Sequence, residues 1–452
     1  IGKMSTKVVS FFLLPLYTAM LSAEELGTVD YIISISTFCV PFVSFLMDEA
    51  VFRFLIDCKS NDESKSTISS SLFLVAIGNL LFLLVGIPIM LAIHYKYTMY
   101  MILYVLSSVL TAMVASLIRG MGKTSKYVLL SFLVSTITVV MNVVLIAVLK
   151  IGLVGMLIAS ITAHTVVPLI FIFSMKLWKY ISFKSIDKSL LKDMVKYSVP
   201  LIPNKISWSI INLSDRIIIM NIINSTASGL YAAAYKFPNL VDTVYGFFYQ
   251  SWKESSARAL QDSGTEAFYN SIYKYLKKFM FSFVLCLTAF MPIIFNILIN
   301  KSYNEAIVYI PPLVLSTYFA NISGFYGGIF TAYKDTKIMG TTTVVSAIIN
   351  LAVHFALIKF IGLYAAAYST LISNVVVYIY RKIKVKQYID LNENWFENIS
   401  AVVVMSLIWV MFYSNQTLLH ITGYVVSASY AIIVNREMLV SVFKKFIRRV
   451  KH

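Results

Sequence analysis

The sequence predicts an all-α polytopic membrane protein: about 14 transmembrane helices, arranged as two pseudo-symmetric six-helix bundles plus two C-terminal helices. Three observations predict this fold: apolar runs long enough to cross a bilayer, basic residues confined to alternate loops, and an internal repeat. Of the 452 residues, 59% are hydrophobic and only 13% are charged, whereas about a quarter of the residues in a soluble domain are charged. The composition therefore excludes an ordinary soluble protein.

Each apolar run approaches the roughly 20 residues that a helix needs to cross the hydrocarbon core. Successive spans alternate in direction, so every second loop lies on the same side of the membrane. In chain order, the spans are expected at residues 8–21, 28–51, 68–93, 98–118, 127–149, 153–175, 199–221, 228–250, 279–299, 305–331, 338–358, 362–380, 398–414 and 418–435.

The basic residues show which loops face the cytoplasm. If the N-terminus is inside, 31 of the 38 Lys and Arg residues lie in inside loops, and the outside loops hold only Lys96, Lys150, Lys301 and Lys359. Basic residues near span ends are retained on the cytoplasmic side, so we predict that both termini are cytoplasmic. The net charge of +17 is spread over many short loops, which indicates orientation signals and contacts with membrane lipids, and not nucleic-acid binding.

An internal repeat supports the division into two bundles. The heptapeptide Gly-Leu-Tyr-Ala-Ala-Ala-Tyr occurs at 229–235 and again at 362–368. Between the halves, Gly27 pairs with Gly229 at an offset of 202, Gly152 with Gly362 at 210, and residues 123–126 with 334–337 at 211. Two six-span bundles in the same sense are related by an axis along the membrane normal. Chance similarity among apolar segments is the alternative.

The repeat sets the predicted domain boundaries. We expect an N-terminal six-helix bundle over residues 1–175 and a C-terminal six-helix bundle over 199–383. Residues 176–198 join them as a cytoplasmic amphipathic linker, because Lys188, Lys192 and Lys196 recur at helical spacing beside apolar residues. Residues 384–452 add two transmembrane helices and a basic cytoplasmic tail.

Three of the predicted spans carry polar residues along one helical face, which a lipid-facing helix does not need. Two explanations stay open: spans 2, 7 and 8 line a common hydrated cavity, or they form interhelical hydrogen bonds in a dry bundle. The residues are Asp30, Ser34, Thr37, Pro41, Ser44 and Asp48 in span 2; Lys205, Ser209, Asn212 and Arg216, with Trp208 and Asp215 beside them, in span 7; and Lys236, Asn239, Thr243, Gly246 and Gln250 in span 8.

Two of these cations are expected at similar depth. Arg216 lies roughly 9 Å and Lys236 roughly 10 Å below the outer ends of their spans, at about 1.5 Å per helical residue. Together they are able to hold one polyanion, because guanidinium forms bidentate bonds to phosphate and ammonium adds a point charge. The alternative is a structural ion pair in which Asp215 neutralises one of them. Asp242 is a candidate for charge balance or for carrying a coupling ion.

The sequence offers no sign of a metal, a cofactor or catalytic machinery. Cys39, Cys58 and Cys286 are isolated from one another and from any His cluster, so no zinc site is indicated. No phosphate-cradling Gly-rich loop and no Ser-His constellation at a membrane face is present. In the tenth span, Gly324, Gly327 and Gly328 are expected to permit close helix approach and bending.

Several motifs together resemble bacterial polysaccharide flippases, in the polysaccharide-transporter branch of the multidrug/oligosaccharidyl-lipid/polysaccharide exporter superfamily. Each motif is loose alone, but their order and spacing cover essentially the whole chain. They are Asp215-Arg216 followed by Gly229 to Lys236; Pro15-Leu16-Tyr17 with Glu24-Glu25-Leu26-Gly27 and then Arg53; and Arg119-Gly120-Met121-Gly122-Lys123 after span 4.

The resemblance implies a flippase that carries an undecaprenyl-diphosphate-linked oligosaccharide to the outer leaflet of the bacterial cytoplasmic membrane, for capsule, O-antigen or teichoic-acid assembly. It implies that Arg216 and Lys236 hold the diphosphate, and that Lys205 and Arg53 act as inner-side steps. Spans 13 and 14 would border a lipid-tail groove. The sugars would meet polar and aromatic residues, namely Trp208, Asn212, Asn239, Tyr245 and Tyr249.

The expected partners are the lipid-linked oligosaccharide, membrane lipids, and a polymerase or other assembly proteins, with the chain itself a monomer. Whether H⁺ or Na⁺ couples to transport stays open. A drug or cation antiporter of the same superfamily is the main alternative, although Arg216, Lys236 and Lys205 make the cavity positive. A membrane enzyme of polysaccharide assembly is the other alternative, although every outer loop is short.

Overall fold

The computed structural model describes residues 13–92, 94–260, 264–333, 335, 337–414 and 416–441, without the side chains at 90, 203–204, 207–208, 210–212, 253–254 and 257. Within these ranges the regular structure is helical throughout and contains no strand. The predicted fold class is therefore confirmed. Helices are the expected solution, because each backbone polar group in a bilayer needs a partner within its own segment.

Ten of the described helices are long and apolar enough to cross a membrane. Four further helices, α2 (Leu14–Met20), α11 (Ile202–Ile222), α13 (Lys236–Ala259) and α17 (Tyr364–Val385), coincide with the remaining predicted spans. Only part of the first predicted span, 8–21, lies in the described residues. Charged residues lower the hydropathy of α11, α13 and α17, so these helices are the ones expected to face protein or water.

The chain forms two compact units, unit 1 over Ile1–Ala232 and unit 2 over Ala233–His452. The division falls near the end of α12, whereas the repeat places the boundary of the bundles at 176–198. The seventh predicted span, α11, thus packs with the N-terminal helices as part of unit 1, where it contacts α3.

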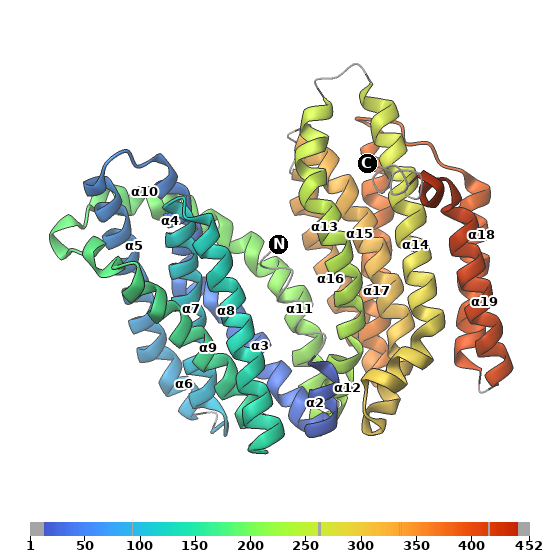
Figure 1. Cartoon of the computed structure of the whole chain (residues 1–452), viewed down its shortest axis with the longest axis horizontal. Coiled ribbons are helices and arrows are strands. Elements are labelled where there is room, and N and C mark those ends of the chain that lie inside the picture. Colours follow the sequence, from blue (N-terminus) through green and yellow to red (C-terminus); the bar gives the residue numbers. More distant parts are fainter. Residues whose placement is uncertain are drawn as a thin grey trace, which may run out of the picture. The chain divides into compact units, whose positions relative to one another are not determined.

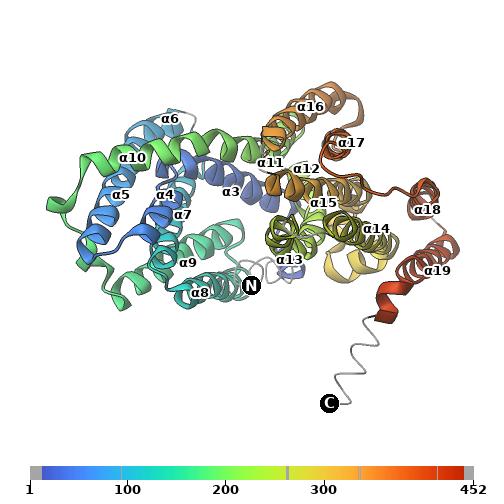
Figure 2. The ribbon, with the colours of Figure 1, turned by 90° about the horizontal axis from the view of Figure 1, so that it is seen from above.

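In unit 1 most helices follow one another with short connections, and π-helical segments at Phe82–Gly86 and Val143–Val148 extend two of them (Figures 1 and 2). The remaining helices of unit 1 are α3 (Ala23–Ser44), α4 (Met47–Asp57), α5 (Asn61–Leu81), α6 (Ile87–Ala92), α7 (Thr98–Gly120), α8 (Thr124–Asn142), α9 (Leu153–Ser174), α10 (Lys188–Ser198) and α12 (Ser225–Ala234), which runs two residues past the division.

The second predicted span is broken, so the prediction of one continuous helix over 28–51 is wrong. Phe45 and Leu46 both adopt left-handed backbone conformations, with φ of 49° and 52°. Ser44 contributes to the break, because its Oγ accepts a hydrogen bond from the Leu46 N–H at 3.2 Å and competes with the helical pattern. The buried side chains of Leu46 and Met47 hold the turn in place. Asp48 therefore lies on α4 and not on the polar face of α3.

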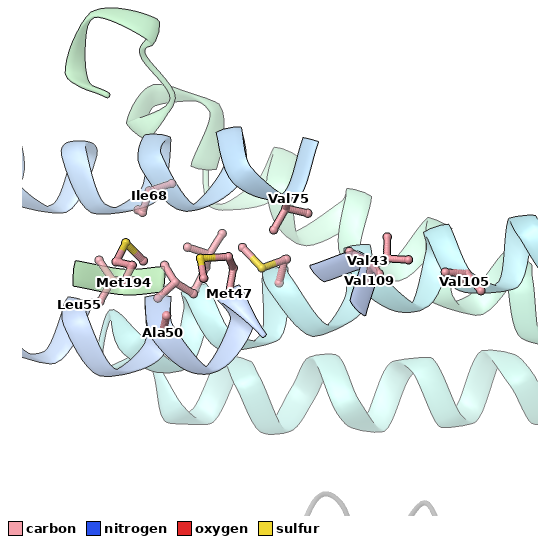
Figure 3. Close-up of a cluster of buried hydrophobic side chains, with 12 residues drawn as sticks. Val43, Met47, Ala50, Leu55, Ile68, Val75, Val105, Val109 and Met194 are labelled. Atoms are coloured by element: carbon pink, nitrogen blue, oxygen red, sulfur yellow. The ribbon is translucent and has the colours of Figure 1, made fainter. Parts of the chain in front are cut away.

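A hydrophobic core holds α3, α4, α5, α7 and α10 together, as Figure 3 shows. Met47 and Ala50 of α4 pack there with Val109 of α7 and Met194 of α10. Within the predicted linker, α10 is an amphipathic helix, since Met194 is fully buried while Lys188, Lys192 and Lys196 are exposed. The earlier part of the linker forms two 3₁₀ turns, Leu177–Tyr180 and Phe183–Ser185.

Two glycines paired by the sequence repeat meet where α3 and α12 cross. A Cβ at Gly27 would lie 2.4 Å from the Gly229 nitrogen, and a Cβ at Gly229 would lie 1.7 Å from the Ala23 carbonyl oxygen. The two backbones are thus in direct contact, as at the small-residue crossings of membrane helices. The two glycines of another repeat pair share a left-handed backbone conformation. Gly152, before α9, and Gly362, before α17, have φ of 69° and 55°.

Unit 2 consists of α13, α14 (Thr265–Leu298), α15 (Ile310–Ala332), α16 (Lys337–Ile361), α17, α18 (Trp395–Tyr413) and α19 (Thr417–Val434), with a 3₁₀ segment at Lys301–Tyr309. The tenth-span glycines of α15 allow aromatic residues of α13 to approach its backbone. A Cβ at Gly328 would lie 2.3 Å from Nε1 of Trp252, and a Cβ at Gly324 would lie 2.7 Å from the Tyr245 hydroxyl. The Trp252 indole donates to the Phe325 carbonyl at 3.0 Å. The expected close approach is therefore present.

The hairpin of α18 and α19 packs beside α14, and a carboxylate ties its start to the rest of unit 2 (Figure 1). Glu393, in the loop before α18, accepts bonds from Lys277 at 2.8 Å, Asn398 at 2.7 Å and Lys382 at 3.1 Å, and also from the Tyr273 hydroxyl. Partial burial disfavours the ionised carboxylate, but the bonds from Asn398, Lys277 and Tyr273 outweigh it and lower the pKa of Glu393 to about 2.

We predict that Gly229→Ala destabilises unit 1, because its methyl group has no space at the α3–α12 crossing. Overpacking of this kind costs about 1–3 kcal/mol, and a lower melting temperature of the purified protein would report it. Gly340→Ala is the control, because nothing lies within 4 Å of its Cβ position in α16. Equal melting temperatures for the two variants would contradict the prediction.

We also predict that protonation of Glu393 weakens the attachment of α18. A carboxylate whose pKa is lowered on folding stabilises the protein above its unfolded pKa, and this contribution is lost as the pH falls from about 4.5 to about 2. At pH 7, Glu393→Gln should cost roughly 1–2 kcal/mol after solvent screening. The measurement is the melting-temperature difference between wild type and variant, which should shrink from pH 7 to pH 3. The exposed Glu266→Gln is the control.

Candidate functional site

A buried ion pair joins α11 to α3 in unit 1. The Arg216 Nε donates to Oδ2 of Asp30 at 2.8 Å, and only 11% of the Arg216 side chain and 21% of the Asp30 side chain are exposed. Charged groups inside membrane segments are costly unless they are paired, and here each partner compensates the other. The ion pair joins predicted spans 2 and 7, two of the three with polar faces.

A second polar link joins α11 to α12. The Tyr231 hydroxyl donates to Oδ2 of Asp215 at 2.7 Å, and both residues are buried. The sequence left open whether Asp215 neutralises a neighbouring cation. In the structure, Asp30 pairs with Arg216, and Asp215 accepts a hydrogen bond from the tyrosine of the repeated heptapeptide.

These links lie close to the glycine crossing, so α3, α11 and α12 meet in one place. Asp30 follows Gly27 by one helical turn on α3, and Tyr231 follows Gly229 by two residues on α12. The direct backbone contact between Gly27 and Gly229 fixes the spacing of the two helices. As a result, Asp30 and Tyr231 both reach α11 at the consecutive residues Arg216 and Asp215. We call these four polar residues the Arg216 cluster.

Two other predicted cations lie away from the Arg216 cluster. Lys205 is exposed and lies 11 residues before Arg216 on the same helix, which corresponds to about 16 Å along the axis. Arg53 lies on α4 and pairs with Asp57 at 2.6 Å, with 48% of its side chain exposed. Their roles as inner-side steps stay predictions.

The rest of the predicted polar face of unit 1 is only partly described. On α3, Ser34 is half-buried and Thr37 is exposed. Asp48 is half-buried and lies beyond the helix break. The side chains of Trp208 and Asn212 lie outside the described residues.

The predicted residues of span 8 all lie on α13, in unit 2. Asn239 is exposed and Asp242 half-buried, while the Thr243 hydroxyl donates to the Asn239 carbonyl at 2.7 Å. Tyr245 and Tyr249 stack with ring centres 5.6 Å apart. Lys236 is half-buried at the start of α13. Because Lys236 and Arg216 belong to different units, their joint binding of one anion stays a prediction.

One buried cation was missed by sequence reasoning, which placed it in an inside loop. Arg381 of α17 is 5% exposed, and its guanidinium donates to Thr342 Oγ1 at 2.8 and 3.0 Å and to the Ser323 carbonyl at 3.1 Å. The available signal was helical spacing, since Arg381 continues the face of Ser373 and Val377 at intervals of four residues. Arg381 thereby ties α17 to α15 and α16.

The arrangement holds no metal centre in the part of the chain that the structure describes. No group of three or more His, Cys, Asp or Glu side chains is close enough there to hold a metal ion. The Arg216 cluster places a guanidinium next to the carboxylate of Asp30. A guanidinium is suited to carboxylate and phosphate groups.

A polytopic helical membrane protein with a charged cluster on its helices is the class that this fold and site define. The chain belongs to the polysaccharide biosynthesis protein family, whose sequence model matches residues 1–252. A comparison with curated protein sequences finds no significant match.

Solved structures share the fold over nearly the whole chain. The lipid II flippase MurJ, in an inward closed conformation, matches with a TM-score of 0.72 and 14% identity over 97% of this chain and 99% of that one. An inward-facing multidrug resistance MATE family transporter of the MOP superfamily matches with a TM-score of 0.67 and 14% identity, over 86% and 95%. An outward-facing MATE transporter matches with a TM-score of 0.58 and 14% identity, over 85% and 93%. The resemblance expected from the motifs is confirmed for family and fold.

We predict strong energetic coupling between Asp30 and Arg216. Asp30→Asn or Arg216→Gln alone leaves one charge buried without its partner, whereas the double variant removes both charges. Removing one partner of a buried pair costs about 3–5 kcal/mol of unfolding free energy. The loss in the double variant should therefore be smaller than the sum of the two single losses by about 1–3 kcal/mol. Thermal unfolding of the four proteins measures this coupling.

The exposed pair of Arg53 and Asp57 provides a matched control for this cycle. Surface ion pairs contribute about 0–1 kcal/mol, so Arg53→Gln and Asp57→Asn should show little coupling. Additive losses for Asp30 and Arg216 would argue against a structural ion pair.

Proposed function

We propose that the protein is a flippase that moves an undecaprenyl-diphosphate-linked oligosaccharide repeat unit from the inner to the outer leaflet by alternating access. The proposed setting is the bacterial cytoplasmic membrane with both termini in the cytoplasm, and the product serves capsule, O-antigen or teichoic-acid assembly. The family's link to polysaccharide biosynthesis and the fold shared with a lipid II flippase support this proposal. In this view the protein is a transporter and not an enzyme.

The observation that carries the proposal is the membrane-buried Arg216 with its carboxylate partner. A permanently charged guanidinium is expensive inside a membrane helix, so its presence calls for a role. Asp30 pairs with Arg216 at 2.8 Å and balances its charge. A diphosphate offers several oxygens to the same guanidinium and takes the place of Asp30. The ion pair thus acts as a resting state of the substrate site.

The proposal keeps the roles that the sequence predicted for the other residues. Lys236 supplies a second charge to the diphosphate, and Lys205 and Arg53 receive the headgroup from the inner side. On α13, Asn239, Tyr245 and Tyr249 offer polar and aromatic surfaces suited to sugars.

The membrane potential supplies a driving force for this direction of transport. Moving one charge through 100 mV is worth about 2.3 kcal/mol. An inside-negative potential therefore favours outward movement of an anionic headgroup. The two phosphates of the substrate make this contribution larger.

We predict that purified protein carries polyprenyl-diphosphate-linked sugar, and that the substrate is lost when the cations are removed. The test is native mass spectrometry of wild type, Asp30→Asn, and the double variant Asp30→Asn with Arg216→Gln. Asp30→Asn should keep the substrate, because Arg216 remains and the competing Asp30 carboxylate is gone. The double variant, which has no unpaired buried charge, should lose it. Lys236→Gln should weaken binding in the same assay.

Lys359→Gln, which removes an exposed charge, is the control and should leave binding unchanged. Equal amounts of glycolipid bound to wild type and to the double variant would contradict the assignment of Arg216 to the substrate site. A bound small organic cation in place of any glycolipid would favour the drug or cation antiporter.

A further inference from the structure

Unit 2 buries a guanidinium whose charge no carboxylate balances. Arg381 of α17 is 5% exposed, and within the described part of the chain no Asp or Glu oxygen lies within 4 Å of its nitrogens. The other buried arginine of the described residues, Arg216, pairs with Asp30. A permanent charge buried without a counter-charge is costly. Arg381 therefore calls for an anion that the described side chains do not supply.

The hydrogen bonds of Arg381 leave part of its guanidinium unsatisfied. A guanidinium has five N–H donors. Nε and Nη2 both donate to Thr342 Oγ1, at 3.0 and 2.8 Å, and Nη1 donates to the Ser323 carbonyl at 3.1 Å. The other two N–H groups have no acceptor among the residues that the structure describes. The acceptors that are present are neutral, so the positive charge stays unbalanced.

A second unsatisfied donor reaches the same turn of α15. Tyr245 of α13 is 7% exposed, and its buried hydroxyl has no hydrogen-bond partner among the described residues. A Cβ at Gly324, which follows Ser323, would lie 2.7 Å from this hydroxyl, and a Cβ at Gly327 would lie 3.5 Å from Nη1 of Arg381. Arg381 also interacts electrostatically with Tyr245. The two groups therefore approach α15, which lies between α13 and α17 (Figure 2), within one helical turn.

We propose that unit 2 binds a chloride ion between the Arg381 guanidinium and the Tyr245 hydroxyl, beside the Ser323–Gly327 turn of α15. The donors that lack an acceptor and the single positive charge are together satisfied by one monovalent anion. A monatomic anion accepts hydrogen bonds from several directions and needs less space than a phosphate group. The glycines at 324 and 327 keep side chains away from this turn. This site lies within unit 2 and is distinct from the Arg216 cluster of unit 1.

The test is thermal unfolding of the purified full-length protein in mixtures of sodium chloride and sodium gluconate at constant ionic strength. The melting temperature of wild type should rise with the chloride concentration and then level off. At ten times the dissociation constant, bound chloride raises the ratio of folded to unfolded protein about elevenfold. Arg381→Gln removes the charge and should abolish the chloride dependence. Arg436→Gln removes an exposed arginine of the same unit and should keep it.

A second variant keeps the proposal testable if Arg381→Gln does not fold. Tyr245→Phe keeps the ring and removes one donor, so half of the chloride effect should require about fivefold more chloride. Equal melting temperatures of wild type in chloride and in gluconate would overturn the proposal. Stabilisation by sodium pyrophosphate but not by chloride would also overturn it, and would assign Arg381 to the substrate headgroup. Unfolding requires no transport, so the outcome is independent of the proposed function.

Discussion

The absence of water in the membrane core is the constraint on which the rest of this structure depends. Backbone groups satisfy one another within helices, and every departure from a helix needs its own compensation. At Phe45 and Leu46 the Ser44 hydroxyl and buried side chains supply that compensation. Charged side chains obey the same rule, since Arg216 meets Asp30 and Arg381 meets hydroxyl and carbonyl oxygens.

Much of the fold could be predicted from the sequence, because the signals act over short distances. Apolar length and loop charge are local properties, and they located helices at all fourteen predicted segments. The break in the second span could not be predicted, because it depends on a hydroxyl bonding to a backbone group two residues away and on burial by other helices. The division into units at Ala232 also depends on packing between helices distant in sequence.

The candidate site shows the same limit. Polar residues at helical spacing indicated α3 and α11, but which carboxylate would meet Arg216 depended on the crossing of three helices. Asp215 is adjacent to Arg216 in sequence, whereas Asp30, which pairs with Arg216, lies 186 residues earlier in the chain. The glycine repeat was a usable signal, because the backbone contact of Gly27 with Gly229 brings Asp30 to Arg216 and Tyr231 to Asp215.

A binding group that already has an internal partner has a kinetic consequence. A ligand that replaces Asp30 gains only the difference between its own bonds to Arg216 and those of the carboxylate, so affinity stays moderate even for a highly charged ligand. Moderate affinity shortens the time that a ligand stays bound. In the proposed transport cycle the carboxylate would return as the ligand leaves, so Arg216 would keep an anionic partner. The ion pair would thus favour rapid turnover over tight storage.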